Sequence, residues 1–336
     1  MRRQFIQHRL DNKESIMGLQ VRDIARDCRF GAIVEGLQTA DLDSAALRRE
    51  LTQLWLDRGV LVFHGLDGSA ATQVALSSVF GKNEIHSTKK LLGDDAPVLE
   101  DAFPELLQVK QTPEDGDIYE VDGQQLAGYL PWHKDLIYFD RINRGGLMRV
   151  IEAPRSGGKT GFMDQIEFYA SLPEDLKERI EHLNGIYSAN FNAATKKYGH
   201  RPSLVRQNTM LRSVQENLHR FERVVHPLVF VQPESGRKVL NVSPWFLVAI
   251  EGLDEQESDE LAERLVEHCE RGDATYFHEW RMGDMVLFDN WRTLHCASGQ
   301  GVDDRRWLQR TTIAGDYALG RALSGATLGS HQKIGI

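Results

Sequence analysis

The chain has 336 residues, with 40 basic against 49 acidic side chains and a formal net charge of −9. A nucleic-acid-binding protein needs a cationic surface for the phosphates, so this balance argues against that class. Three cysteines are too few for a disulfide scaffold and suit a reducing compartment. The chain has no apolar run of the roughly 20 residues that a spanning helix needs, and its N-terminus lacks the apolar core of a secretory signal. These features predict a soluble protein of the cytoplasm, with no membrane or nucleic-acid partner.

The first 80 residues predict an arm followed by alternating strands and helices. Residues 1–20 are polar and carry little pattern, which predicts an N-terminal arm. Residues 30–37 predict a short strand, and 43–58 predict a helix whose leucines recur at helical spacing. The run GVLVFHGL (59–66) is typical of a buried strand, and 72–80 predicts a second helix.

From residue 128 onward, short apolar runs alternate with glycine- and proline-containing turns. Strands are predicted at 130–139, 147–152, 159–163, 226–232, 237–242, 275–280 and 284–288, and helices at 165–184 and 254–271. Many short strands with few helices predict a mainly β fold, a double-stranded β-helix (jelly-roll) core decorated by α-helices. No linker divides the chain, so we expect one domain over 21–320 and a C-terminal tail over 321–336.

A candidate metal site lies in the segment PWHKDLIYF. His133 and Asp135 are two residues apart, and on a strand such residues point to the same face while Lys134 points away. A third ligand would complete the two-His, one-carboxylate triad of non-haem Fe(II) oxygenases. The similar run at 268–270 lies in a predicted helix, where residues i and i+2 diverge by about 200° and do not chelate.

The segment from 284 to 316 resembles the C-terminal signature of the taurine dioxygenase/TfdA-like family of Fe(II)- and 2-oxoglutarate-dependent dioxygenases. That family places a ligand histidine five residues after an asparagine, and arginines 11 and 15 residues after the histidine. Asn290, His295, Arg306 and Arg310 have this spacing.

Other parts of the chain resemble the same family. Trp132-His133-Lys134-Asp135 is followed by Gly157-Gly158-Lys159-Thr160, as in family members. The segments 225–246 and 80–86 also resemble family motifs, so the resemblance covers about residues 30 to 316.

The resemblance implies roles for five of these residues. His133, Asp135 and His295 would bind Fe(II), the cofactor, which neutral imidazoles and an ionised carboxylate suit. Thr160 and Arg306 would bind the cosubstrate 2-oxoglutarate, because a planar guanidinium forms bidentate hydrogen bonds to a carboxylate. Because neighbouring side chains of a strand point to opposite faces, Arg305 and Lys159 are expected to face solvent.

The resemblance also implies a substrate site, with departures from the taurine enzyme. The candidate substrate-binding residues are His86, Lys89, Tyr129, Phe191, Phe246 and Arg310. Lys89 stands where the taurine enzyme has a tyrosine, and Tyr129 where it has an asparagine. These departures argue against taurine as the substrate. The positive charges of Arg310, Lys89 and His86 still favour an anionic substrate.

The sequence therefore predicts a dioxygenase that uses O2 to oxidise, most simply to hydroxylate, a small organic substrate. This substrate is expected to be a carboxylate or sulfonate with an apolar or aromatic body, and the reaction releases succinate and CO2. Two alternatives stay open: a hydrolase or isomerase using another divalent metal on the same scaffold, and a catalytically silent binding homologue. The resemblance also leaves room for a homo-oligomer, a dimer or tetramer.

Overall fold

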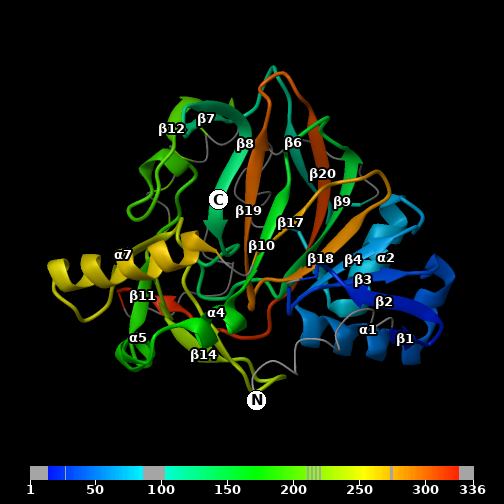
Figure 1. Ribbon diagram of the computed structural model, residues 1–336, viewed down its shortest axis with the longest axis horizontal. Coiled ribbons are helices and arrows are strands. Elements are labelled where there is room, and N and C mark those ends of the chain that lie inside the picture. The colour runs from blue at the N-terminus through cyan, green and yellow to red at the C-terminus, as the bar shows by residue number, and fades with distance from the viewer. Residues whose placement is uncertain are drawn as a thin grey trace, which may run out of the picture.

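Two largely antiparallel sheets form the centre of the protein (Figure 1). The structure is a computed structural model, and it describes residues 14–26, 28–85, 103–209, 212, 215, 218, 221–272 and 275–324. In Figure 1, β8, β19 and β10 of one sheet run alongside β20, β9 and β18 of the other.

The larger sheet has nine strands in the order β1-β2-β3-β4-β18-β9-β20-β5, and β6 also pairs with β20. Only the pairing of β3 with β4 is parallel among those described. The strands are β1 (Glu14–Ile16), β2 (Leu19–Asp23), β3 (Ala32–Glu35), β4 (Val60–His64), β5 (Asn83–Glu84), β6 (Leu107–Gln111), β9 (Gly145–Glu152), β18 (Met285–Asp289) and β20 (Arg306–Ile313).

The smaller sheet has six strands in the order β12-β7-β8-β19-β10-β17. These are β7 (Ile118–Val121), β8 (Gln124–His133), β10 (Thr160–Asp164), β12 (Ser203–Arg206), β17 (Thr275–His278) and β19 (Thr293–Gln300). β19 lies between β8 and β10, and its His295 stands opposite His133 in the register. Residues 162 apart in the sequence thus become direct neighbours.

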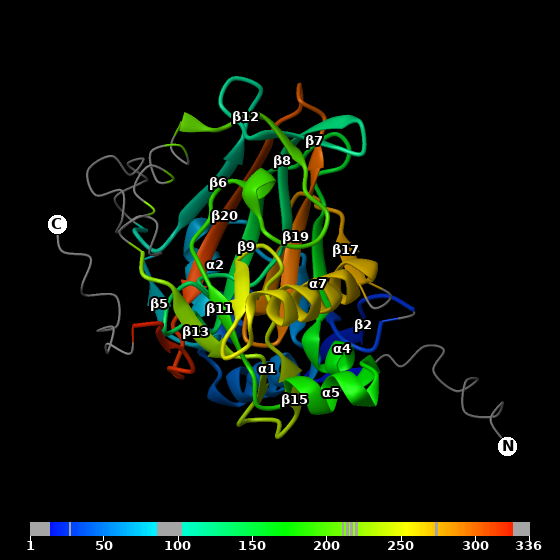
Figure 2. The ribbon, with the colours of Figure 1, turned by 90° about the vertical axis from the view of Figure 1, so that its left-hand side faces the viewer.

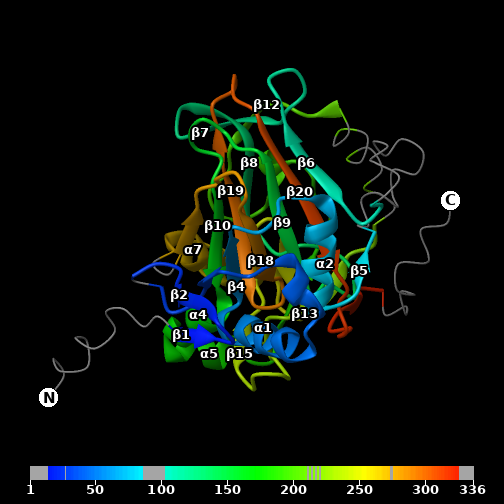
Figure 3. The ribbon, with the colours of Figure 1, turned by 90° about the vertical axis from the view of Figure 1, so that its right-hand side faces the viewer.

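Helices cover the outer sides of the two sheets. Figure 3 shows α1 and α2 beside β4 and β18, and Figure 2 shows α4, α5 and α7 on the other side of the molecule. The helices are η1 (Thr39–Asp43), α1 (Ala45–Arg58), α2 (Ala70–Phe80), α4 (Gln165–Ser171), α5 (Glu174–Ile180), η3 (Ala193–Thr195) and α7 (Glu255–Arg271). Two small sheets complete the fold, with strands β11 (Asn184–Tyr187), β13 (Val224–Pro227), β14 (Val229–Val231), β15 (Lys238–Leu240), β16 (Leu247–Ile250) and β21 (Arg321–Ala322).

The strand β18 shows why the central strands read as unbroken apolar runs. Its Met285 and Leu287 pack in the cluster beneath α1 and α2. Val286 and Phe288 point the other way, into a cluster that includes Phe162 of the smaller sheet. A strand that is covered on both faces needs apolar side chains at every position.

The structure differs from the predicted elements at several places. Strands β1 and β2 begin within residues 1–20, where no strand was predicted, and the predicted strand 226–232 is divided between β13 and β14, which lie in different sheets. Two further differences concern segments near the site. The predicted helix 165–184 is two helices, because Pro173 lacks an N–H and disfavours the helical conformation of the residue before it. The predicted strand 130–139 ends at His133, and a turn follows in which Leu136 has φ = 56°. Lys134 and Asp135 therefore lie outside the sheet. This matters for the metal site, because Asp135 is one of its predicted ligands.

The architecture confirms the predicted fold class, a mainly β jelly roll decorated by α-helices. Within the described part of the chain, no helix combines the length and the apolar character needed to cross a membrane.

Candidate active site

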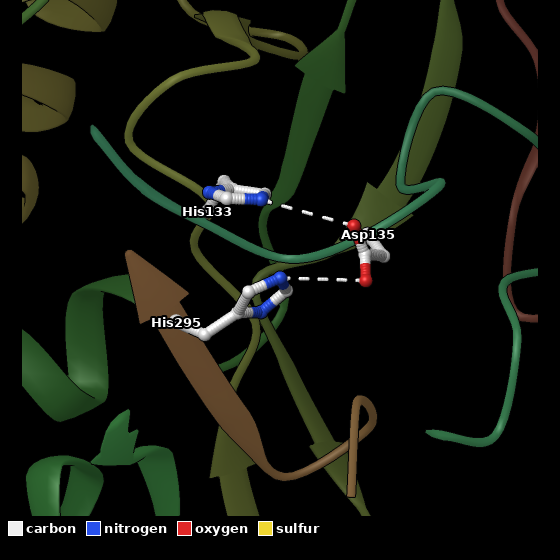
Figure 4. A group of neighbouring side chains, drawn as sticks. All are labelled: His133, Asp135 and His295. Atoms are coloured by element: carbon white, nitrogen blue, oxygen red, sulfur yellow. Dashed lines mark ion pairs between the residues drawn. The ribbon is translucent and has the colours of Figure 1, made fainter. Parts of the chain in front are cut away.

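His133, Asp135 and His295 meet at one point between the sheets (Figure 4). Their ligand atoms all lie within 4.8 Å of one another. Nε2 of His133 is 3.7 Å from Oδ1 of Asp135, and Nε2 of His295 is 3.4 Å from Oδ2. Figure 4 shows the two imidazoles facing the carboxylate from one side. Among the described residues, this is the one group of three or more His, Cys, Asp or Glu side chains with such convergence.

Asp135 reaches the site from a turn and not, as the sequence predicted, from the strand that carries His133. Asn290 fixes this turn, because its Oδ1 accepts from the Asp135 N–H at 2.9 Å and its Nδ2 donates to the Asp135 carbonyl at 3.0 Å. The side chain of Leu136 is buried, and its backbone lies in the left-handed region, an uncommon conformation for a leucine. The carboxylate therefore converges with His133 because tertiary contacts hold the turn, not because of strand alternation.

The donor set fits a divalent transition metal. The Nδ1 of His133 is 2.7 Å from the Pro131 carbonyl, which can only accept, so Nδ1 carries the proton and the Nε2 lone pair faces the site. Burial lowers the pKa of His133 to about 3, so the ring is neutral at pH 7, the form that binds metals. Two imidazoles and one carboxylate suit Fe(II).

Arg310 balances the charge of Asp135. Its guanidinium lies 2.7 Å from Oδ2 of Asp135, and both side chains are largely buried. Burial by itself would raise the pKa of the Asp135 carboxyl, but Arg310 and His295 outweigh it and hold that pKa well below its usual value. Asp135 is therefore ionised over the physiological pH range.

Thr160 and Arg306 lie side by side, as the sequence predicted. The Arg306 guanidinium donates to the Thr160 hydroxyl at 3.0 Å, and the Trp280 indole donates to the same oxygen at 3.0 Å. Arg306 is buried, forms no ion pair within the described chain, and its Nε has no hydrogen-bond partner there. Burial without a counter-charge lowers its pKa to about 10. An unpaired buried cation of this kind is a fitting site for the carboxylate of a ligand.

The turn before Thr160 requires a glycine at position 158. The φ of Gly158 is +57°, and a Cβ there would lie 2.7 Å from Cγ of Pro154, 2.9 Å from Oε1 of Gln300 and 3.1 Å from Cδ of Arg306. The glycine therefore permits both the left-handed turn and the close approach of the arginine.

Aromatic rings border the metal triad. The ring of Phe246 is 6.0 Å from that of His133 and 5.1 Å from that of Tyr138. Tyr138 also contacts Phe191, with ring centroids 5.9 Å apart. Two predicted substrate residues, Phe191 and Phe246, are thus brought together through Tyr138.

The remaining predicted residues have different surroundings. Tyr129 lies four residues before His133 in β8 and packs edge-on against Tyr119. His86 and Lys89 lie outside the described residues. Lys134 points away from the triad as predicted, and its Nζ donates to Oδ1 of Asn241 at 2.8 Å.

The predictions that Arg305 and Lys159 face solvent are confirmed. Arg305 is at the surface, where it pairs with Glu114 and Glu152. Lys159 pairs with Glu279 at the surface. Cys296 is a packed, buried thiol.

Three residues of the site have roles that were not predicted from the sequence: Asn290 supports Asp135, Trp280 donates to Thr160, and Tyr138 lies among the aromatic rings. Asn290 had a signal in the spacing to His295. Trp280 and Tyr138 had none, because their contacts join segments that are distant in the sequence or follow an unpredicted turn.

Comparisons with known proteins agree with this geometry. The profile of the family "Taurine catabolism dioxygenase TauD, TfdA family" matches residues 20–312. An (S)-phenoxypropionate/alpha-ketoglutarate-dioxygenase of Sphingobium herbicidovorans is 31% identical over 303 residues, which cover 89% of this chain and 96% of that protein. An alkylsulfatase of Acinetobacter baylyi is 28% identical, over 92% of this chain and 89% of that protein. A crystal structure of a putative alpha-ketoglutarate-dependent taurine dioxygenase from Burkholderia xenovorans has the same fold, with a TM-score of 0.68 and 24% identity over 93% of this chain and 99% of that one.

The fold and the triad define a metal-dependent oxygenase of the jelly-roll class. More narrowly, the chain belongs to the TauD/TfdA family. This membership and the His-Asp-His site confirm the predicted enzyme class, an Fe(II)/2-oxoglutarate-dependent dioxygenase with O2 as the second cosubstrate. Such enzymes act on small molecules.

Proposed function

We propose that the protein hydroxylates a small organic anion with an apolar or aromatic body. The observation that carries this proposal is the position of Arg310, a buried cation 2.7 Å from the metal-ligating Asp135. A substrate whose carboxylate, sulfonate or sulfate is bound by this guanidinium would lie directly beside the metal. The oxidised carbon would then lie within a few bonds of the anionic group.

The aromatic rings support the apolar part of the proposed substrate. Tyr138 contacts both Phe246 and Phe191, and Phe246 also contacts the ring of His133. Aromatic side chains favour flat or extended apolar groups because their faces provide large contact areas. The names of the two relatives, a phenoxypropionate dioxygenase and an alkylsulfatase, also describe anions with apolar bodies.

In this proposal each side chain has a separate task. His133, Asp135 and His295 hold Fe(II), and Thr160 with Arg306 holds the distal carboxylate of 2-oxoglutarate. Bound there, the metal would supply the oxidising chemistry that converts 2-oxoglutarate, O2 and the substrate into succinate, CO2 and the hydroxylated substrate.

The substrate side is assigned to a second group of residues. Arg310 orients the substrate anion, while Phe191, Phe246 and Tyr129 exclude water from its body. His86 and Lys89 keep their predicted substrate role as part of the proposal.

The test is succinate formation by the Fe(II)-loaded protein against aryloxyalkanoates, alkyl sulfates, sulfonates including taurine, and amino acids. We expect turnover with an anion that has an apolar body. Arg310→Met should lower kcat/KM for that substrate about 100-fold, since the substrate anion loses its buried partner. Turnover of uncharged analogues alone would contradict the assignment of Arg310.

Two controls separate the alternatives. Asp135→Ala should abolish substrate-coupled succinate formation, and wild-type turnover in that variant would refute the metal assignment. Anaerobic Fe(II) with 2-oxoglutarate should give a visible charge-transfer band. Its absence would favour the hydrolase or isomerase, and binding without O2 consumption would favour the silent homologue.

The proposal includes three coarser predictions from the sequence. These are a cytoplasmic location, a single domain over residues 21–320 between an arm and a tail, and a homo-oligomeric state. Support for the single domain comes from His133 and His295, which meet in one site although 162 residues separate them.

A further inference from the structure

The hydroxyl oxygen of Thr160 accepts two hydrogen bonds. One comes from Nε1 of Trp280 and the other from the guanidinium of Arg306, each at 3.0 Å. Indole and guanidinium nitrogens only donate, so both lone pairs of the hydroxyl oxygen are in use. The Thr160 proton therefore has to be donated, and no acceptor for it exists among the described residues.

Arg306 has the same unmet requirement. Its Nε is buried without a hydrogen-bond partner, and no carboxylate of the described chain pairs with it. Thr160 and Arg306 thus offer an O–H and an N–H, from side chains that touch each other, to a missing acceptor. One carboxylate would satisfy both donors.

The strand β17 and its His278 orient the side chain of Trp280. Trp280 follows β17, the strand that pairs with β10 and places His278 opposite Thr160 (Figure 1). The ring of His278 meets the indole edge-on, with centroids 4.6 Å apart, and Nε2 of His278 lies 3.1 Å from Asp284. The indole N–H is therefore fixed in direction.

We propose that Trp280 is a positioning residue for the distal carboxylate of the 2-oxo acid cosubstrate. By donating to Thr160, the indole prevents the hydroxyl from turning toward another acceptor and directs its proton to the ligand. This inference rests on the proposed role of Thr160 and Arg306. Trp280 does not touch the ligand itself.

Trp280 also packs among apolar side chains between the sheets, which is a purely structural role. The two roles predict different ligand dependence. Oxalate chelates a metal through the same kind of oxygen pair as a 2-oxo acid, but it has no distal carboxylate. A positioning role affects 2-oxoglutarate alone, whereas a structural defect affects both ligands.

The experiment measures the Kd of each ligand by anaerobic calorimetry on the full-length, Fe(II)-loaded protein. Trp280→Phe keeps a ring and removes the N–H. We expect about a 10-fold weaker 2-oxoglutarate affinity and an unchanged oxalate affinity, in line with the usual cost of losing an outer hydrogen bond. Trp55→Phe is the matched control, since Trp55 is also buried and its Nε1 has no hydrogen-bond partner in the described chain. It should change neither affinity.

A double-substitution cycle tests whether Trp280 acts through Thr160. In a Thr160→Val background, Trp280→Phe should weaken 2-oxoglutarate binding no further. Additive losses, equal losses for oxalate, or an unchanged 2-oxoglutarate Kd would each overturn the inference. A wild-type protein that binds oxalate and not 2-oxoglutarate would overturn the proposed cosubstrate site as well.

A second measurement does not depend on the folding of a variant. The sequence has six tryptophans, so the Zn(II)-loaded wild-type protein labelled with 15N-Trp should give six indole N–H resonances. We expect 2-oxoglutarate to shift one indole resonance strongly and oxalate to leave that resonance in place. Identical responses to both ligands would contradict the inference.

Discussion

Asn290 is the residue on which the geometry of Asp135 depends. Its amide holds both the N–H and the carbonyl of Asp135, and it also donates to Oδ1 of Asn143 at 2.9 Å. Alanine at this position would release the turn while leaving all three metal ligands in the sequence. A substitution of Asn290 therefore tests the arrangement of the metal ligands without removing any of them.

We expect Asn290→Ala to weaken Fe(II) or Mn(II) binding about 10- to 100-fold, as is usual for groups that orient metal ligands. Metal titration by calorimetry measures this affinity. Asn184→Ala is the control, because Asn184 donates to Glu251 in a half-buried position on another sheet. Equal affinity in wild type and Asn290→Ala would show that the turn keeps its shape without the amide.

Asp117 provides a pH-dependent prediction away from the metal. It is buried, and burial raises its pKa to about 6 even though Oδ1 accepts from the Asn208 N–H. The folded state therefore binds a proton more tightly than the unfolded chain, whose carboxyl titrates near 3.8. As the pH rises from about 4 to 6, the folded protein loses about 3 kcal/mol of stability from this group.

Asp117→Asn should remove this loss, because an amide oxygen also accepts from Asn208 and carries no charge. We expect the variant to be more stable than wild type by about 3 kcal/mol above pH 6.5 and equal to it near pH 4. Urea unfolding across this pH range measures the difference. A difference that does not vary with pH would refute the assignment to this carboxyl.

At the scale of elements, the ends of strands place the functional groups. β8 ends at His133, the turn before β10 ends at Thr160, and β20 begins at Arg306. Within β20, Arg306 and Arg310 are four residues apart and both buried, as alternation predicts. The regular strands were predictable from apolar periodicity, whereas the turn at Asp135 was not, because Asn290 imposes it from a distant segment.

Gly158 makes the turn before β10 testable. We expect Gly158→Ala to raise the Kd for 2-oxoglutarate about 10-fold or more and to destabilise the fold by about 1–2 kcal/mol, since the methyl group meets Arg306 and Gln300. Calorimetry and urea unfolding measure the two effects.

Gly236 is the matched control for this substitution. It also has a positive φ, +66°, but a Cβ there would have no neighbour within 4 Å. Gly236→Ala should show the backbone cost without any change in 2-oxoglutarate affinity. An equal loss of affinity in both variants would mean that the contact with Arg306 does not matter.

At the scale of the whole molecule, the site joins the two sheets. His133, Thr160 and His295 come from the smaller sheet, while Arg306 and Arg310 come from the larger one. Ligands that bind all of these residues therefore connect the two layers, and they bind the folded state alone. Occupancy of the site should be visible in global stability.

We expect Mn(II) with 2-oxoglutarate, each near 100 times its Kd, to raise the Tm by roughly 8 °C, from about 2.7 kcal/mol of linkage per ligand. EDTA should reverse the increase. His295→Ala should show no increase with the same mixture, and a normal increase in that variant would place the metal elsewhere.

Patterns in the sequence predicted several of the central strands and the candidate metal ligands. Unbroken apolar runs indicate strands that are covered on both faces, and the spacing from Asn290 to Arg310 indicated the family and its ligands. Contacts that no local pattern reports hold Asp135 in its turn, bring the Trp280 indole to Thr160, and join Phe191 to Phe246 through Tyr138. The physical reason is that periodicity reports local burial, whereas hydrogen bonds between segments more than 100 residues apart depend on how the two sheets pack.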